Sequence, residues 1–400
     1  MTQISMSSPD LTELEINAVL RVLRSNHLSL GPRVREFEER FAEYVGARHA
    51  IAVSSGTAAL HLSLIASGVG EGDLVITSPF SFVASANCVL YERGVPIFVD
   101  VDPLTGNIDP MLVRAATEEV MQGGATGRRW LPPMVRNSAS FEAKLKAILP
   151  VHAFGQPADM QPILDVAQAH GLSVIEDACE AVGAEYNGRR AGTFGQMSCF
   201  AFYPNKQMTT AEGGMIVTDD ERCASLCSSL RNQGRDVFDA WLSHTRLGYN
   251  YRLNELACAL GIVQLSRLDE MLAKRARVAA WYTERLSGID RVQAPAVADT
   301  TTRMSWFVYV VRFDSMNERT MTMKALADRG IPSRPYFTPI HLQPFYVEKF
   351  GYRRGDFPIT EALGDTSLAL PFSSVMNEDQ VDYVCRELAA ILRGQIVRQI

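Results

Sequence analysis

The sequence predicts an α/β fold in which helices cover both faces of a mostly parallel sheet, followed by a smaller C-terminal α+β domain. Between about residues 50 and 220, short apolar runs alternate with stretches of helical periodicity, which is typical of parallel strands joined by crossover helices. Helical periodicity over 253–284 is long enough to connect two domains, and a new strand-like run follows at 306–313. We therefore expect a large domain over residues 1–265 and a smaller domain over 266–400.

The expected strands of the large domain are short runs rich in Val, Ile and Leu, each bounded by turn residues. They fall at residues 50–54, 74–77, 95–99, 148–152, 172–176 and 215–217, and an aromatic run at 200–203 leads to Lys206. Helical periodicity returns at 221–232. The Gly- and Pro-rich segment 122–133 interrupts this pattern and predicts a surface excursion.

Composition bounds the function classes. The 400 residues are 47% apolar and 21% charged, which is typical of a globular protein large enough for two domains. A net charge of −6 gives no electrostatic footprint for nucleic acid or for an anionic membrane. No run approaches the roughly 18 apolar residues of a membrane span.

The N-terminus and the cysteines predict a cytoplasmic protein. Residues 1–10 lack the basic and apolar segments of a secretory leader. The seven cysteines are scattered, without a CxxC pair, so that they support neither a disulfide framework nor a zinc site. We expect reduced thiols and no metal.

Candidate functional residues follow the expected strands, where ligands bind in open α/β sheets. Ser55-Gly56-Thr57 lies at a strand-to-helix turn, where free backbone N–H groups could bind a phosphate or Ser55 could simply cap the helix. Asp177 follows the run 172–176 and could cap a helix or hold a heterocyclic nitrogen protonated.

Two further side chains complete the pattern. Phe82 lies where a helix begins, and its ring could stack on a planar ligand or belong to the core. Lys206 lies in a Pro/Asn turn, and its amine could be a nucleophile or an ordinary solvated group. A phosphate cradle, a stacking ring, a carboxylate and an amine together are what pyridoxal phosphate requires.

At these residues the chain resembles the DegT-type (DegT/DnrJ/StrS) nucleotide-sugar aminotransferases, which are fold type I pyridoxal-phosphate enzymes. The resemblance runs from about residue 8 to 390 and implies a seven-stranded-type mixed sheet. It is carried by these motifs in order: Leu30-Gly31-Pro32, Ser54-Ser55-Gly56-Thr57-Ala58-Ala59-Leu60, Glu176-Asp177-Ala178, Gly192-Thr193-Phe194-Gly195, Asn205-Lys206, Glu212-Gly213-Gly214, Leu247-Gly248-Tyr249-Asn250-Tyr251-Arg252, Pro339-Ile340-His341 and Ala369-Leu370-Pro371.

The resemblance implies roles for individual residues. Lys206 matches the Schiff-base lysine, which also moves the proton, and Asp177 matches the carboxylate on the pyridine nitrogen. Phe82 matches the stacking ring. Gly56 and Thr57, with Ser55, match the phosphate donors.

Other positions are expected around this centre. Asn250 matches an asparagine that reaches the cofactor phosphate of the neighbouring subunit, which implies a homodimer with shared active sites. Arg252 and His341 are candidates for binding the sugar substrate.

Two positions depart from the family pattern. Ala201 stands five residues before Lys206, where the family commonly has a phosphate-binding serine. Its hydrogen bond is then missing or comes from another group, such as the Tyr203 hydroxyl. Glu180 stands where relatives often carry glutamine or histidine near the phenolic oxygen of the cofactor, so that it could bind cofactor or sugar.

The implied activity is transamination in two half-reactions, through a Lys206 internal aldimine and a pyridoxamine phosphate intermediate. The amino donor is L-glutamate by family analogy, and the acceptor is a nucleotide-diphospho-keto-6-deoxy sugar with a 3- or 4-keto group.

Three alternatives stay open. One is a sugar dehydratase of the same family, although those enzymes carry histidine at the position of Lys206. Another is a non-catalytic regulatory protein that binds pyridoxal phosphate. Lastly, Arg128, Arg129 and Trp130 could reach the nucleotide diphosphate or form a plain solvated loop.

Overall fold

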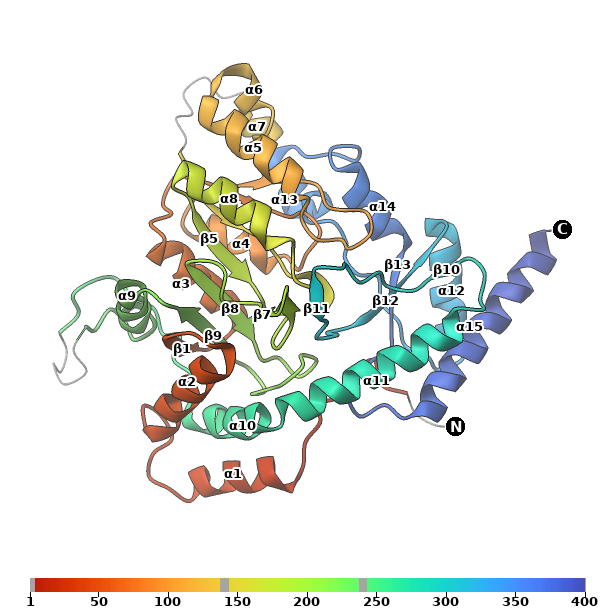
Figure 1. The fold of residues 1–400 in the computed structure, drawn as a ribbon, viewed down its shortest axis with the longest axis horizontal. Helices are drawn as coiled ribbons and strands as arrows, with labels where there is room; N and C mark the ends of the chain where they lie inside the picture. Colours follow the sequence, from red (N-terminus) through yellow and green to blue (C-terminus); the bar gives the residue numbers. More distant parts are fainter. Residues whose placement is uncertain (1–3, 137–143, 237–242, 400) are drawn as a thin grey trace.

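A seven-stranded mixed sheet forms the centre of the larger part of the molecule, in a computed structural model that describes residues 4–136, 144–236 and 243–399 (Figure 1). Its strands, in spatial order, are β1 (His49–Val53), β9 (Gly214–Thr218), β8 (Met197–Ala201), β5 (Ser173–Asp177), β4 (Leu145–Leu149), β2 (Leu74–Thr77) and β3 (Val95–Phe98). Strand β9 is antiparallel to both of its neighbours, and the remaining pairs are parallel. The predicted fold class is confirmed.

Helices cover both faces of this sheet, which explains why its strands are apolar without alternation. One face packs on α3 (Gly56–Ala66) and α9 (Glu221–Arg231). The other packs on α5 (Pro110–Gln122), α8 (Met160–His170), α2 (Pro32–Val45) and α10 (Glu255–Ser266). This part also contains α1 (Glu13–Leu23), which lies against α10, and α4 (Ala84–Tyr91).

A small unit follows the long helix α11 (Leu268–Leu286), which crosses from the large sheet to the second part of the molecule (Figure 1). The predicted helix over 253–284 is therefore two helices, because α10 ends at Ser266 and Arg267 is its C-cap. The small unit contains an antiparallel sheet of β10 (Val292–Gln293), β12 (Tyr309–Phe313) and β13 (Ser367–Leu370), and helices α12 (Met316–Ala327), α14 (Pro358–Thr366) and α15 (Glu378–Gln399).

The N-terminal segment also contributes to the small unit. Ile4 is buried in the same apolar cluster as Val278, Tyr309 and Leu388. The backbone N–H of Phe372 donates to the carbonyl of Met6 at 2.9 Å. A division of the chain into 1–265 and 266–400 stays a prediction.

Short elements connect the two parts. Strand β11 (Thr301–Arg303) pairs with β6 (Glu185–Tyr186), which pairs with β7 (Arg189–Arg190). Helix α13 (Pro344–Phe350) lies beside α7 (Pro133–Arg136). The predicted surface excursion 122–133 includes α6 (Gly124–Arg128) and leads into α7 at the upper edge of Figure 1.

The topology brings the candidate residues to one edge of the sheet. Strands β1, β2, β5 and β8 all point in the same direction, since β1 and β8 are each antiparallel to β9. Their carboxyl ends therefore lie together, where parallel sheets bind ligands. Within the described ranges, no helix is long and apolar enough to cross a membrane, and no group of three or more His, Cys, Asp or Glu side chains could hold a metal ion.

Candidate active site

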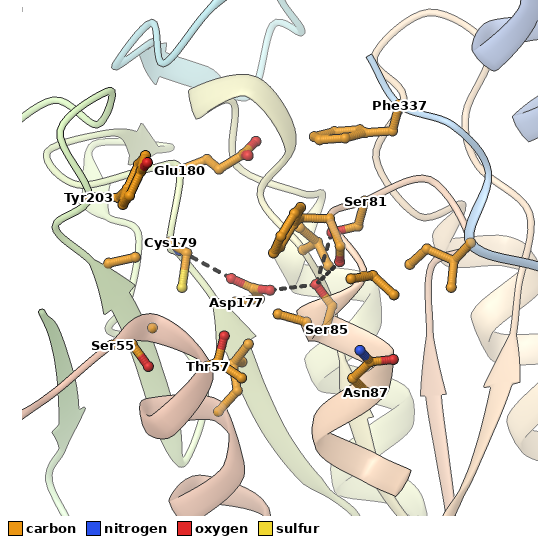
Figure 2. A pocket seen from close by; sticks show the side chains of 18 of the residues that line it. Ser55, Thr57, Ser81, Ser85, Asn87, Asp177, Cys179, Glu180, Tyr203 and Phe337 are labelled. Carbon is orange, nitrogen blue, oxygen red and sulfur yellow. Dashed lines mark hydrogen bonds between the residues drawn. The ribbon is translucent and has the colours of Figure 1, made fainter. Parts of the chain in front are cut away.

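A cavity of about 960 Å³ lies between the carboxyl ends of these strands and the small unit. Its lining includes eight of the residues predicted from the sequence: Ser55, Gly56, Thr57, Phe82, Asp177, Glu180, Tyr203 and Lys206. Figure 2 shows Ser55 and Thr57 on one side of Asp177, and Ser81 and Ser85 on the other. These side chains belong to four separate segments, which only the folded sheet brings together.

The start of helix α3 forms one end of the cavity. Ser55 caps the helix, because its Oγ accepts the backbone N–H of Ala58 at 3.1 Å. A Cβ atom on Gly56 would lie 2.7 Å from the Cβ of Ala201 and 2.8 Å from the Sγ of Cys179. Glycine is therefore required where the helix packs on β8. The N-terminus of α3, with its unpaired N–H groups, is suited to an anion.

Asp177 lies at the end of β5, beneath the cavity, and is only 5% exposed. Its Oδ2 accepts the hydroxyl of Ser85 at 2.6 Å, and its Oδ1 accepts the backbone N–H of Cys179 at 3.2 Å (Figure 2). Ser81 lies 2.8 Å from Ser85, between their Oγ atoms. These contacts hold a buried carboxylate in one orientation at the cavity floor.

Lys206 follows β8, and its Nζ atom lies 3.4 Å from Oε1 of Glu180. The same Nζ atom is 3.8 Å from the ring centroid of Phe307, which comes from the small unit. Glu180 Oε2 accepts the backbone N–H of Phe154 at 2.9 Å. Burial raises the pKa of the Glu180 carboxyl, while the charge of Lys206 opposes this shift. The amine of Lys206 therefore lies between a carboxyl group, that of Glu180, and an apolar ring, that of Phe307.

Two aromatic side chains present their rings to the cavity. Phe82 is 63% exposed and immediately precedes α4, and Tyr203 is 52% exposed. An exposed phenylalanine ring at a cavity is not a core residue, which removes one of the two interpretations of Phe82. Its face is available to a planar ligand.

Asn250 and Arg252 are absent from the lining of this cavity. Asn250 is exposed and pairs with Asn232, and Arg252 Nη1 donates to Oδ1 of Asn232 at 3.0 Å. Burial and the neighbouring charge of Arg235 lower the pKa of Arg252. Both residues lie on a segment bound to the end of β1, where Arg252 pairs with Val53.

His341 lies behind the cavity wall. It is completely buried, and its Nε2 atom is 3.0 Å from Oε1 of Glu361. Burial lowers the pKa of its imidazole. The neighbouring Ile340 lines the cavity instead. A direct contact of His341 with sugar is therefore not supported by this geometry, because the 3₁₀ turn 340–342 points the histidine inward.

The arginines of the excursion are also placed elsewhere. Arg129 forms an ion pair with Glu119 at 2.6 Å, and the indole N–H of Trp130 donates to the same carboxylate at 2.8 Å. Arg129 and Trp130 line a separate cavity of about 220 Å³. Arg128, Arg129 and Trp130 are absent from the lining of the large cavity.

Sequence reasoning missed several residues of the cavity. Ser85 lies in the same string as Phe82, and its position after a strand end was the signal that could have found it. The motif around His341 pointed to the opposite wall, but not to its aromatic residues, which are Phe307, Tyr336, Phe337, Phe345 and Tyr346. Figure 2 shows Phe337 facing Glu180 across the cavity.

Comparison with models of protein families shows to which family the chain belongs. The model of the DegT/DnrJ/EryC1/StrS aminotransferase family matches residues 9–389. The chain belongs to this family. The resemblance predicted from the motifs is thereby confirmed, as is the expectation of a pyridoxal-phosphate-dependent aminotransferase.

Individual members of the DegT/DnrJ/EryC1/StrS family agree with this assignment. GDP-perosamine synthase of Caulobacter vibrioides is 39% identical over 396 residues, which cover 98% of this chain and 99% of that protein. The crystal structure of S. venezuelae DesV matches with a TM-score of 0.84 at 31% identity, covering 98% of each chain. The PMP form of Spr1654 from Streptococcus pneumoniae matches with a TM-score of 0.87 at 25% identity, covering 99% of each chain.

Proposed function

We propose that this protein transfers an amino group from an amino acid, L-glutamate, to a nucleotide-linked keto-6-deoxy sugar, using pyridoxal phosphate held by Lys206. The observation that carries the proposal is the convergence of Lys206 and Asp177 on one cavity whose end is the N-terminus of α3. An amine, a carboxylate and an anion site at the same strand ends match the three polar parts of that cofactor.

The residues present fit the cofactor. Gly56 and Thr57 at the start of α3 line the cavity and would hold the phosphate. Asp177, fixed by Ser85, would hold the ring nitrogen protonated, and the exposed ring of Phe82 would cover the planar face. When bound, pyridoxal phosphate supplies an electron sink and carries the amino group from one substrate to the other.

Lys206 is the acid–base group of the proposed reaction. Its Nζ atom would hold the cofactor covalently and, once released, would move the proton between the substrate carbon and the cofactor carbon. The ring of Phe307 and the carboxyl of Glu180 pack against this amine, whose side chain is only 13% exposed. The donor leaves as its keto acid, and the sugar keto oxygen leaves as water.

The wall from the small unit would hold the sugar. Phe307, Tyr336, Phe337 and Phe345 form a mostly apolar surface opposite Asp177 and Glu180. Such a surface suits the methyl group of a 6-deoxy sugar, while Glu180 could bond a hydroxyl. The similarity to a GDP-perosamine synthase places GDP-linked keto sugars first among substrates to test.

We also propose a homodimer with shared active sites. Asn250 is exposed and lies outside the cavity of its own subunit, as a residue that serves the neighbouring subunit must. Arg252, two positions further along, would follow it toward the partner's nucleotide sugar.

Specific residues argue against the two alternative functions. A dehydratase of this family would carry histidine in place of Lys206. A non-catalytic regulatory protein has no need of an amine that shares a substrate-sized cavity with Asp177 and Glu180.

One assay tests the proposal. The purified protein, loaded with pyridoxal phosphate, is mixed with L-glutamate and a panel of GDP-, dTDP-, UDP- and CDP-linked 3- or 4-keto-6-deoxy sugars. We expect 2-oxoglutarate and a sugar product whose mass shows an amine in place of the keto oxygen. Lys206→Ala and Lys206→Arg should abolish both products and the visible absorbance of the lysine-bound cofactor. Retained turnover in either variant, or loss of a sugar hydroxyl without amination, would contradict the proposal.

A further inference from the structure

Arg275 on helix α11 is a buried cation without an anionic partner. It is 1% exposed and is among the largest fully buried side chains of the protein. Within the described residues, no carboxylate lies at ion-pair distance from its guanidinium, and its Nε atom has no hydrogen-bond partner. Burial of an arginine in this way is costly, so that some other interaction must retain it.

The guanidinium donates only to backbone carbonyls, in two pairs. Nη1 lies 3.2 Å from the carbonyl oxygens of both Trp306 and Phe307. Nη2 lies 2.8 Å from the carbonyl oxygen of Lys206 and 3.4 Å from that of Asn205. One side chain therefore joins the loop of the reactive lysine to the segment that leads from the small unit.

The second segment is held in a conformation that requires support. Trp306 has a φ of 50°, in the left-handed region that non-glycine residues seldom adopt. The backbone N–H of Phe307 donates to the carbonyl of Phe154 at 3.1 Å. A Cβ on Gly155 would lie 2.8 Å from the Trp306 nitrogen, so that the two backbones are in close contact.

These two segments carry the groups that meet in the cavity. The Phe307 ring lies against Lys206 Nζ, and Phe154 donates to the Glu180 carboxyl that faces the same Nζ. Arg275 lies behind this arrangement and does not line the cavity.

We propose that Arg275 is a positioning residue for Lys206: its buried guanidinium ties the Asn205–Lys206 backbone to the Trp306–Phe307 backbone and so places Lys206 Nζ against the Phe307 ring. The inference rests on the proposed role of Lys206 as the cofactor-binding amine. The guanidinium also places a positive charge beside the lysine's own carbonyl.

Two variants separate the geometric effect from the electrostatic effect. Arg275→Met keeps the length of the side chain but removes charge and donors, and Arg275→Lys keeps the charge but cannot reach both carbonyl pairs. Arg319→Met is the matched control. Arg319 lies on α12 of the small unit, is also buried, and donates to the backbone carbonyl of Asp365.

The experiment measures three quantities on the full-length protein: the pH midpoint of the visible absorbance of the lysine-bound cofactor, the rate at which the apo-protein forms this link with added pyridoxal phosphate, and the melting temperature. In Arg275→Met we expect the midpoint to rise by roughly one pH unit and link formation to slow about tenfold. Arg275→Lys should keep the wild-type pH midpoint but form the link with pyridoxal phosphate more slowly than the wild type. Arg319→Met should lower only the melting temperature.

The outcomes distinguish this inference from the proposed function. A wild-type protein without a lysine-bound absorbance would overturn the proposed function itself. A normal wild type, together with an Arg275→Met variant that has the wild-type midpoint and rate, would overturn only the role of Arg275. If Arg275→Met fails to fold, Arg275→Lys decides, because a wild-type rate of link formation in that variant is incompatible with positioning.

Discussion

The Nζ atom of Lys206 and the Oε1 atom of Glu180 lie 3.4 Å apart, with side chains that are only 13% and 8% exposed. Burial raises the pKa of Glu180, and the nearby negative charge of Asp177 raises it further. The Phe154 N–H and the Lys206 charge act in the opposite direction. The carboxyl therefore exchanges its proton more readily near neutral pH than an exposed glutamate does.

Replacing Glu180 with glutamine should change the pH dependence of the reaction. The amide keeps the shape and still accepts the Phe154 N–H, but it does not titrate. Because a raised carboxyl pKa moves its titration toward neutrality, we expect the acid limb of the kcat/KM profile between pH 5 and 8 to flatten. Thermal unfolding of the same variant is the control for structure. Superimposable profiles of the variant and the wild type would show that Glu180 does not titrate during turnover.

Removing the Ser85 hydroxyl should weaken cofactor binding through Asp177. The variant Ser85→Ala deletes a charge-assisted bond of 2.6 Å, worth roughly 1.5–3 kcal/mol, so that the Kd for pyridoxal phosphate should rise about tenfold or more. Titration of the apo-protein measures this. Ser198→Ala is the matched control. The buried Ser198 hydroxyl donates at 3.0 Å to Glu176, which immediately precedes Asp177 in β5. Equal effects of both substitutions on Kd would contradict a specific role for Ser85.

Restoring a serine at position 201 should not weaken cofactor binding. The Ala201 side chain packs where helix α3 begins, within 2.7 Å of the Cβ position at Gly56. A hydroxyl there could donate to an anion at the helix N-terminus, so that Ala201→Ser should bind pyridoxal phosphate as tightly as the wild type or up to about tenfold more tightly. Gly56→Ala, which forces a Cβ against Ala201, should weaken binding in the same titration. A clear loss of affinity in Ala201→Ser would mean that the phosphate lies elsewhere.

Mixed dimers test whether Asn250 serves the partner subunit. Lys206→Ala and Asn250→Ala should each be impaired alone. After unfolding and refolding of an equal mixture, random association gives hybrids in which one site contains both Lys206 and the partner's Asn250, and about a quarter of the wild-type activity should return. If Asn250 acted within its own subunit, every site would lack one group and no activity would return.

The buried pair of His341 and Glu361 should make the protein less stable as the pH falls. Burial lowers the folded-state pKa of His341, so that below its ordinary pKa of about 6.5 the unfolded chain binds more protons than the folded chain. Stability is therefore lost as the pH falls through and below about 6.5. His341→Gln should reduce the slope of unfolding free energy against pH, as measured by urea denaturation. An unchanged slope would show that another group dominates in this range.

Much of the large domain was predictable because its strands are local apolar runs that end at turn residues. The strand expected at 74–77 is β2 (Leu74–Thr77), and that expected at 95–99 is β3 (Val95–Phe98). The helix expected over 253–284 was wrong in its continuity, because the periodicity of the two helices continues across the break at Arg267. The local pattern records which face is buried but not a change of helix axis.

Some residues of the candidate site could likewise be predicted from the sequence, and others could not. Ser55, Gly56, Asp177 and Lys206 each follow a strand, and parallel strands bring their carboxyl ends to one edge, so that their convergence follows from topology. His341 lies in an equally recognisable motif, yet its side chain is buried, because a single 3₁₀ turn decides which of two neighbouring residues faces the cavity.

The amino-acid sequence by itself determined the family, the mostly parallel α/β sheet and the positions of Lys206 and Asp177 at strand ends, since these depend on periodicity and on local motifs. Only the tertiary structure decided what surrounds Lys206. Three distant segments contribute these neighbours. Oε1 of Glu180 lies 3.4 Å from Nζ, and the ring centroid of Phe307 lies 3.8 Å from Nζ. Nη2 of Arg275 lies 2.8 Å from the backbone oxygen of Lys206. The Glu180 contact forms when β5 and β8 pair in the large sheet, and the Phe307 and Arg275 contacts form when the small unit and α11 pack on it, so that no local pattern encodes them.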